Sequence, residues 1–278
     1  MKSIPLLSLF ATILGLPIAS TAPTESIARG ESISTRCINT KYDQGGWFIG
    51  ECLTGQDDTT RIQSSVYLRN KIVFHKISED VRRLDFAVAG YNDGYSQSGN
   101  CWDCWLTNTT ILTCKCNYVP GYLTYLDLES RIKVYNGHLL SDVIKPNPTP
   151  PATPSKYLFP SNDSDRRWGI GGNGTCEIPN LDPSVCEKLA PSCDGGVVAI
   201  DEAPTHCYQV FQSYFGPFYF RDLQLKGSAA WRLEGWDNDK CEGEPIVKIE
   251  PEQKDTCFKA GNLIRAVTIV PGWNGDPW

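Results

Sequence analysis

The sequence predicts an all-β protein in which a pseudo-symmetric two-repeat β domain, a Pro-rich linker and a second disulfide-stapled β-rich domain follow one another. Three observations support this prediction. Apolar and polar residues alternate with the period of two that is typical of half-buried strands. Twelve cysteines are divided evenly, six on either side of a proline-rich stretch. A fifteen-residue cysteine spacing occurs twice in the first half, which indicates an internal repeat.

Residues 1–22 have the layout of a secretory signal peptide. Lys2 precedes an apolar run over residues 4–18, and small residues follow it. The run is too short for a membrane-spanning helix, and Pro5 and Pro17 bracket it. We therefore expect a secreted, extracellular protein that does not insert into a membrane.

Export has consequences for the cysteines and for three asparagines. Thiols are oxidised in the secretory pathway, so disulfides are expected. Asn108, Asn162 and Asn173 each begin an Asn-x-Ser/Thr sequon, where N-glycosylation is expected.

The charge and the histidines exclude two classes of ligand. The formal charge of −6 becomes −7 when the leader is removed, because Lys2 is its only charged side chain. An acidic chain does not attract polyphosphate, so nucleic acid is not an expected partner. The chain has only three histidines, and none are spaced like a metal-binding pair.

The linker prediction depends on one low-complexity stretch. KPNPTPPATPSK, at 145–156, contains five prolines, a composition that favours extended polyproline II. We place the first domain at 34–143, the linker at 144–157 and a cysteine-rich β domain of unknown function at 158–278. Each domain is large enough for a core of its own.

The first domain repeats itself. Cys37 and Cys52 recur as Cys101 and Cys116, with the same spacing. A Leu-x3-Ile frame follows each pair, within SSVYLRNKI and LTYLDLESRI. Two copies of one cysteine-clipped unit predict a pseudo-twofold arrangement.

NCWDCWLTNTTILTCKC, at 100–116, is predicted to form an antiparallel hairpin. If it turns at 108–110, Cys104 faces Cys114 and Leu106 faces Leu112, on one side of the hairpin. The opposite face of the hairpin then carries Trp105, Thr107, Ile111 and Thr113. Cys101 and Cys116 are one residue out of register, so a bulge is needed near 102–103.

Nested disulfides are the best interpretation of these four cysteines, with Cys101 bonded to Cys116 and Cys104 to Cys114. Cys37–Cys52 is the corresponding bond of the first copy. A four-thiolate zinc site needs reduced cysteines, and a redox CxxC motif needs a strand that leads into a helix. Neither condition is met in an exported β hairpin.

These motifs resemble the cyanovirin-N homology (CVNH) family, particularly its fungal secreted members. The resemblance covers residues 34–142 and includes YNGHL after the second Leu-x3-Ile frame. It implies an elongated all-β pair of repeats that exchange strands, and it leaves open a strand-swapped homodimer. It also implies a lectin that binds high-mannose glycans at shallow sites near each end, without metal, cofactor or catalytic residues.

The resemblance implies carbohydrate-binding residues by position. One site comprises residues before the first cysteine, after the second cysteine and at the turn of the second repeat, namely Thr35, Arg36, Thr54, Val134, Tyr135 and Asn136. The other site maps to Asn100 and Asn117. Asn136 stands where the family has an aspartate, and residues 73–84 replace the turn of the first repeat.

The C-terminal half predicts a disulfide-stapled β-sandwich or small barrel. Alternating segments lie at 216–225, 229–236, 245–250 and 263–270, and 182–193 reads as a short helix. Neighbouring acids such as Asp201 and Glu202 are interpreted as solvated surface rather than as a glycosidase pair.

We therefore expect a lectin and not an enzyme. Two alternatives stay open: an interaction or effector-like protein whose lectin fold has lost sugar binding, and a carbohydrate-active enzyme with catalysis in the C-terminal domain. Loss of binding on replacing Asn136 and Tyr135 favours the lectin. Binding that survives periodate treatment of the target favours the interaction protein, and sugar release from polysaccharide favours the enzyme.

Overall fold

The computed structural model describes residues 30–276 except for thirteen gaps, at 77–81, 88–100, 117–122, 144–147, 152–155, 161, 163–165, 173–196, 202, 210–211, 214–215, 218–219 and 228. The expected leader, Asn100, Asn117, Asn173 and the expected helix at 182–193 lie outside the described residues. No helix within the described residues is long and apolar enough to cross a membrane.

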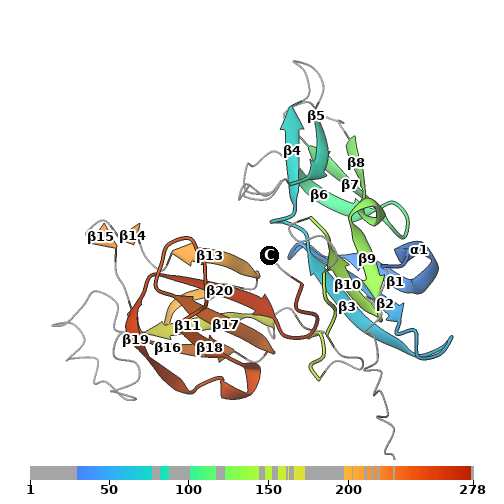
Figure 1. The fold of residues 1–278 in the computed structure, drawn as a ribbon. Helices are drawn as coiled ribbons and strands as arrows, with labels where there is room; N and C mark the ends of the chain where they lie inside the picture. The colour runs from blue at the N-terminus through green and yellow to red at the C-terminus, as the bar shows by residue number, and fades with distance from the viewer. Residues whose placement is uncertain are drawn as a thin grey trace, which may run out of the picture.

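The protein is all-β, as predicted, and Figure 1 shows two β modules. The first repeat of the N-terminal module has a three-stranded antiparallel sheet and a hairpin. The sheet is formed by β1 (Cys37–Tyr42), β2 (Trp47–Leu53) and β3 (Arg61–Tyr67). The hairpin is formed by β4 (Ile72–Lys76) and β5 (Arg82–Phe86). A single helical turn, α1 (Ile33–Arg36), precedes β1.

The second repeat has the same order of elements. Its sheet is formed by β6 (Cys101–Leu106), β7 (Ile111–Cys116) and β8 (Leu123–Asp127). Its hairpin is formed by β9 (Ile132–Tyr135) and β10 (His138–Ser141), after a 3-10 turn at Leu128–Ser130. A sheet followed by a hairpin, twice, is the pseudo-twofold arrangement that the cysteine spacing predicted.

Each hairpin contacts the sheet of the other repeat. β10 lies against β3 and β5 lies against β8. The Leu139 N–H donates to the Ser64 hydroxyl at 2.9 Å, and the Leu84 N–H donates to the Thr124 hydroxyl at 3.1 Å. The repeats therefore exchange hairpins within one chain and share a single core.

The Leu-x3-Ile frames provide the centre of that core. Leu68, Ile72, Leu128 and Ile132 are all fully buried and belong to one cluster. In each repeat a tight turn separates the leucine from the isoleucine, and the isoleucine begins the hairpin. The frame therefore turns the chain from sheet to hairpin while both side chains stay inside.

The three disulfides of this module join the predicted partners. Cys37 is bonded to Cys52, Cys101 to Cys116, and Cys104 to Cys114. The register of β6 and β7 shifts between Trp102 and Cys104, where a bulge was expected.

The C-terminal module is a β-sandwich of two four-stranded antiparallel sheets. One sheet has the order β12-β11-β16-β19, formed by Val197–Asp201, Trp168–Gly172, Phe220–Gly227 and Cys257–Ile264. The other has the order β13-β20-β17-β18, formed by Thr205–Gln209, Ala266–Pro271, Trp231–Trp236 and Val247–Ile249. The short strands β14 (Gln212–Ser213) and β15 (Gly216–Pro217) pair apart from both sheets. A Cys207–Cys241 disulfide ties β13 to the loop after β17.

An aromatic cluster joins the two modules. Trp47 of β2 packs against Phe159, Trp231 and Trp273, with ring centroids 5.8 to 6.3 Å apart. Trp231 and Trp273 meet edge to face at 4.8 Å. Aromatic contacts of this kind stabilise beyond the area that they bury.

The segment after β20 extends this contact into the first module. The Trp273 indole N–H donates to the Ser65 hydroxyl at 3.2 Å, and the Asn274 amide donates to the Leu139 carbonyl at 3.2 Å. Asp276 forms a buried ion pair with Lys71, with Nζ and Oδ2 3.2 Å apart. Burial raises the pKa of Asp276 and lowers that of Lys71, because it disfavours the charged form of each.

Candidate functional site

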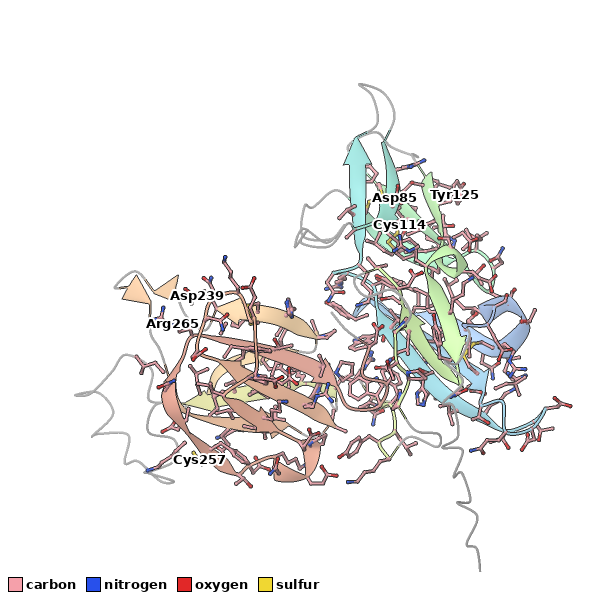
Figure 2. All side chains as sticks on the ribbon, viewed as in Figure 1. Asp85, Cys114, Tyr125, Asp239, Cys257 and Arg265 are labelled. Atoms are coloured by element: carbon pink, nitrogen blue, oxygen red, sulfur yellow. A yellow bond between two sulfur atoms is a disulfide. The ribbon has the colours of Figure 1, made fainter. Side chains whose placement is uncertain are left out.

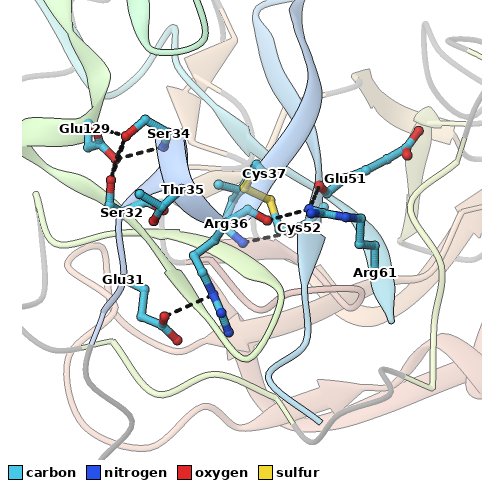
Figure 3. The surroundings of a disulfide bond; sticks show 12 residues. Glu31, Ser32, Ser34, Thr35, Arg36, Cys37, Glu51, Cys52, Arg61 and Glu129 are labelled. Carbon is cyan, nitrogen blue, oxygen red and sulfur yellow. Dashed lines mark hydrogen bonds and ion pairs between the residues drawn. A yellow bond between two sulfur atoms is a disulfide. The ribbon is translucent and has the colours of Figure 1, made fainter. Parts of the chain in front are cut away.

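The Cys37–Cys52 disulfide organises the predicted site of the first repeat. Cys37 begins β1, Cys52 lies near the end of β2, and the two residues are register partners with Cα atoms 4.0 Å apart. The residues before Cys37 therefore lie beside those that follow Cys52 (Figure 3).

Arg36 and its neighbours are held by charged groups. Arg61 donates to the Arg36 carbonyl at 2.7 Å and to the Glu51 carbonyl at 3.2 Å. The Arg36 guanidinium pairs with Glu31, with Nε and Oε2 3.0 Å apart (Figure 3). The backbone just before the first cysteine is thus fixed. The Arg36 side chain is partly exposed and the Glu31 side chain is exposed.

The segment Thr54-Gly55 lies between Arg36 and the second-repeat turn. A Cβ atom on Gly55 would lie 3.6 Å from Nη2 of Arg36, and a Cβ atom on Gly137 would lie 3.2 Å from the Thr54 Cα. The Thr54 N–H donates to the Thr60 carbonyl at 2.9 Å, which closes the intervening loop. Positions far apart in the sequence are thereby brought to one surface.

Asp57 shapes that loop. Its carboxylate accepts hydrogen bonds from the hydroxyl and the N–H of Thr60 and of Thr59. These bonds hold the pKa of Asp57 well below its usual value, because they stabilise the ionised form.

The turn between β9 and β10 presents Asn136. Tyr135 and His138 are register partners, so Asn136 and Gly137 form a two-residue turn. Both have left-handed backbone angles, with φ of 51° and 84°, as a type I′ turn requires. The Asn136 side chain is exposed at the tip.

The N-terminal segment completes the site. Glu31 and Val134 exchange backbone hydrogen bonds of 2.8 and 2.9 Å, which places Glu31 beside β9. The backbone N–H and carbonyl of the buried Val134 are therefore both hydrogen-bonded to Glu31. Tyr135 is 6% exposed, and burial, with a contribution from Asp142, raises its pKa.

The predicted residues thus fall into two groups. Thr35 and Asn136 are exposed and Arg36 is partly exposed, whereas Thr54, Val134 and Tyr135 are buried. The Thr35 hydroxyl donates to the Ser32 carbonyl at 3.1 Å. The three buried residues support the surface, while the exposed ones carry the polar groups that a ligand can reach.

Glu31 and Arg61 were missed by sequence reasoning. Neither belongs to a local motif, because their positions depend on the pairing of residue 31 with residue 134 and on the return of β3 beside β2. An acidic residue five positions before Arg36 does not by itself indicate that it belongs to a binding site. The second predicted site, at Asn100 and Asn117, lies outside the described residues.

The site offers hydrogen bonds to a ligand. It presents a carboxylate, a guanidinium, an amide and a hydroxyl where the segments around Arg36, Thr54 and Asn136 meet, a surface here called the rim, and these groups suit the paired hydroxyls of a sugar. In the part of the chain that the structure describes, no cluster of three or more His, Cys, Asp or Glu side chains is placed to hold a metal ion.

Solved structures are similar to one part of the chain. No family model matches the sequence, and no curated protein matches it. The solved structure of TbCVNH from T. borchii matches with 22% identity and a TM-score of 0.29, over 40% of this chain and 98% of that one. The MoCVNH-LysM module of the rice blast fungus Magnaporthe oryzae matches with 13% identity and a TM-score of 0.30, again over 40% and 98%.

A third structure, a MoCVNH3 variant in complex with (N-GlcNAc)4, matches with 12% identity and a TM-score of 0.29, over 40% of this chain and 97% of that one. The structural neighbours of the chain are thus CVNH proteins, and these matches leave its C-terminal half uncovered.

Proposed function

We propose that this protein is a secreted lectin, which binds mannose-type glycans through its N-terminal module without metal or catalysis. The observation that carries the proposal is the rim, where Glu31, Arg36 and Asn136 present planar hydrogen-bonding groups on adjoining segments. Planar carboxylate, guanidinium and amide groups each bind two neighbouring hydroxyls at once, and neighbouring hydroxyls are the characteristic feature of a pyranose.

Preorganisation supports the proposal. A disulfide, a two-residue turn and the Arg61 hydrogen bonds hold the backbone of the rim. A ligand therefore need not order this surface when it binds, which lowers the entropic cost of binding. The proposal includes no metal, because amide, guanidinium and hydroxyl groups bind sugars directly.

Secretion is part of the same proposal. Four disulfides are present among the described residues, and such bonds persist in oxidising compartments. The layout of residues 1–22 supports the same compartment.

The test uses the full chain, expressed with its own leader in a eukaryotic secretory host, purified from the medium and applied to a glycan array without added metal. The array carries high-mannose structures and also oligomers of N-acetylglucosamine, the sugar named in one of the similar structures. We expect retention on mannose-rich structures, and a loss of about tenfold or more when Asn136 is replaced with alanine.

Asn262→Ala is the matched control, because Asn262 is an exposed asparagine on β19 of the other module. It should leave glycan binding unchanged. A folded, fully disulfide-bonded protein that retains no glycan, or one whose binding is equally strong in Asn136→Ala, would refute the proposal.

A further inference from the structure

The sheet β6-β7-β8 of the second repeat has an outward face that the site described above does not use. Its inner face is part of the core and includes Cys104, Leu112 and Leu126. On the outward face, Trp105 is the register partner of Thr113, and Thr113 is the partner of Tyr125. One row across the three strands is therefore aromatic, hydroxyl, aromatic.

The two rings of this row are exposed and the residue between them is not. Trp105 is 36% exposed and Tyr125 is 56% exposed, whereas Thr113 is 1% exposed. The Thr113 hydroxyl is hydrogen-bonded to that of Thr107 on the same face. Adjacent strands are about 4.8 Å apart, so the two aromatic residues lie about 10 Å apart across the sheet.

Charged groups flank the aromatic row. Lys115 of β7 lies with Nζ 5.8 Å from the centre of the Trp105 ring, and it pairs with the exposed Asp103 of β6. Asp127 is exposed at the other end of β8. Figure 2 shows Tyr125 on the side of the N-terminal module that is turned away from the C-terminal module.

The area of the row is too small for a protein partner. Full burial of one aromatic side chain removes 150–250 Å², so the exposed parts of Trp105 and Tyr125 amount to about 200 Å² together. A stable protein interface needs about 800 Å² from each partner. Charged residues are also depleted at the centre of such interfaces, whereas here Lys115 lies directly beside the ring.

A sugar chain fits both features. A pyranose has an apolar face of C–H groups, which packs on an aromatic ring, and hydroxyls at its edge, which bond to ammonium and carboxylate groups. The spacing of about 10 Å between the strands that carry the two aromatic residues suits a ligand of several sugar units rather than a monosaccharide.

We propose that the outward face of β6-β7-β8 is a second carbohydrate-binding surface, on which Trp105 and Tyr125 stack against separate units of one oligosaccharide. The proposal shares with the proposed function only the class of ligand, because it uses none of the residues around Asn136. Lys115 and Asp103 bind hydroxyls of the sugar that covers Trp105.

The test compares the full wild-type chain with Trp105→Ala, Tyr125→Ala and the double variant by titration calorimetry. The probes are a high-mannose oligosaccharide and tetra-N-acetylglucosamine, with mannose and N-acetylglucosamine as single-unit comparisons. The protein is made in an oxidising bacterial periplasm without N-glycosylation. No glycan at Asn108, in the β6–β7 turn, then competes for the surface.

We expect two binding sites per wild-type chain for at least one oligosaccharide and one site in the double variant. Each single variant should weaken the second site about 3- to 10-fold. The variants Trp105→Phe and Tyr125→Phe keep an aromatic ring and should therefore bind the oligosaccharide about as well as the wild type. Tyr208→Ala, which removes a tyrosine that is 44% exposed on β13, should change nothing.

Asn136→Ala separates this proposal from the proposed function. If that variant loses the other site and keeps the Trp105-dependent one, both proposals hold. If Asn136→Ala has no effect while the aromatic double variant abolishes binding, the second surface stands and the proposed function falls. A double variant with unchanged stoichiometry and affinity, or a wild-type chain that binds neither oligosaccharide, overturns the second surface.

Discussion

Replacing Asp276 with asparagine removes the negative partner of a fully buried lysine. The side chain of Lys71 is fully buried and that of Asp276 is 3% exposed, with Nζ and Oδ2 3.2 Å apart. Asp276 also accepts a hydrogen bond from the Ser141 N–H at 2.9 Å, which the carbonyl oxygen of asparagine can accept as well. The substitution therefore changes the charge and keeps the shape.

The expected cost at pH 7 is about 3–5 kcal/mol of unfolding free energy, the usual result of removing one charge of a buried ion pair. A second estimate agrees. Lys71 in the variant can avoid carrying a buried charge without the Asp276 carboxylate by releasing its proton, and its unfolded pKa is about 10.4. Deprotonation at pH 7 then costs about 4.6 kcal/mol, at about 1.36 kcal/mol per pH unit.

The same argument predicts a pH dependence. A lysine with a lowered folded pKa contributes stability fully above its unfolded pKa and loses that stability as the pH falls. The deficit of Asp276→Asn should therefore shrink to about 2 kcal/mol at pH 9. Wild-type protein provides the reference at each pH.

The assay is urea unfolding of the full chain, followed by the fluorescence of the tryptophans at the module contact. Lys71→Met combined with Asp276→Leu is the companion variant, and it should be more stable than Asp276→Asn because no buried charge is left. A loss below about 1 kcal/mol at pH 7, or a loss that does not change between pH 7 and 9, would refute the reasoning.

Two further predictions concern the turn between β9 and β10. Gly137→Ala should lower the unfolding free energy by about 1–3 kcal/mol and weaken glycan binding, because φ is +84° and the new Cβ would lie 2.8 Å from Ile62. The control is Gly243→Ala, where φ is +88° and nothing lies within 4 Å. In thermal unfolding the control should lose less stability than Gly137→Ala. Burial lowers the pKa of His138 from 6.5 to about 4, so its stabilising effect should be full above pH 6.5 and fall by about 3 kcal/mol as the pH drops to 4. Urea unfolding of His138→Gln should show a flatter pH profile than wild type, and parallel profiles would contradict this.

The hairpin of residues 101–116 was predictable because its signals are local. Its cysteine pairing, its bulge and the two faces of its strands follow from a register that the turn determines. The Leu-x3-Ile frames indicated the repeat, but only the structure shows that their four apolar residues form the centre of the core.

The candidate site was predictable only in part. The resemblance indicated Arg36, Thr54 and Asn136, and the structure brings these three segments together. It did not indicate Glu31 or Arg61, nor that Tyr135 is largely buried. Exposure depends on what packs from other segments, here the backbone around Gly30 against the Tyr135 ring, and this packing has no sequence period.

By itself, the sequence determined the hairpin of residues 101–116, the disulfides of the first module and the presence of two repeats, because short motifs carry each of these signals. Only the tertiary structure decided that Trp273 and Asp276 enter the first module and that Trp105 and Tyr125 lie exposed in one row. These features depend on contacts between distant segments. Such contacts form where burial of apolar area and pairing of charges are most favourable over the whole fold.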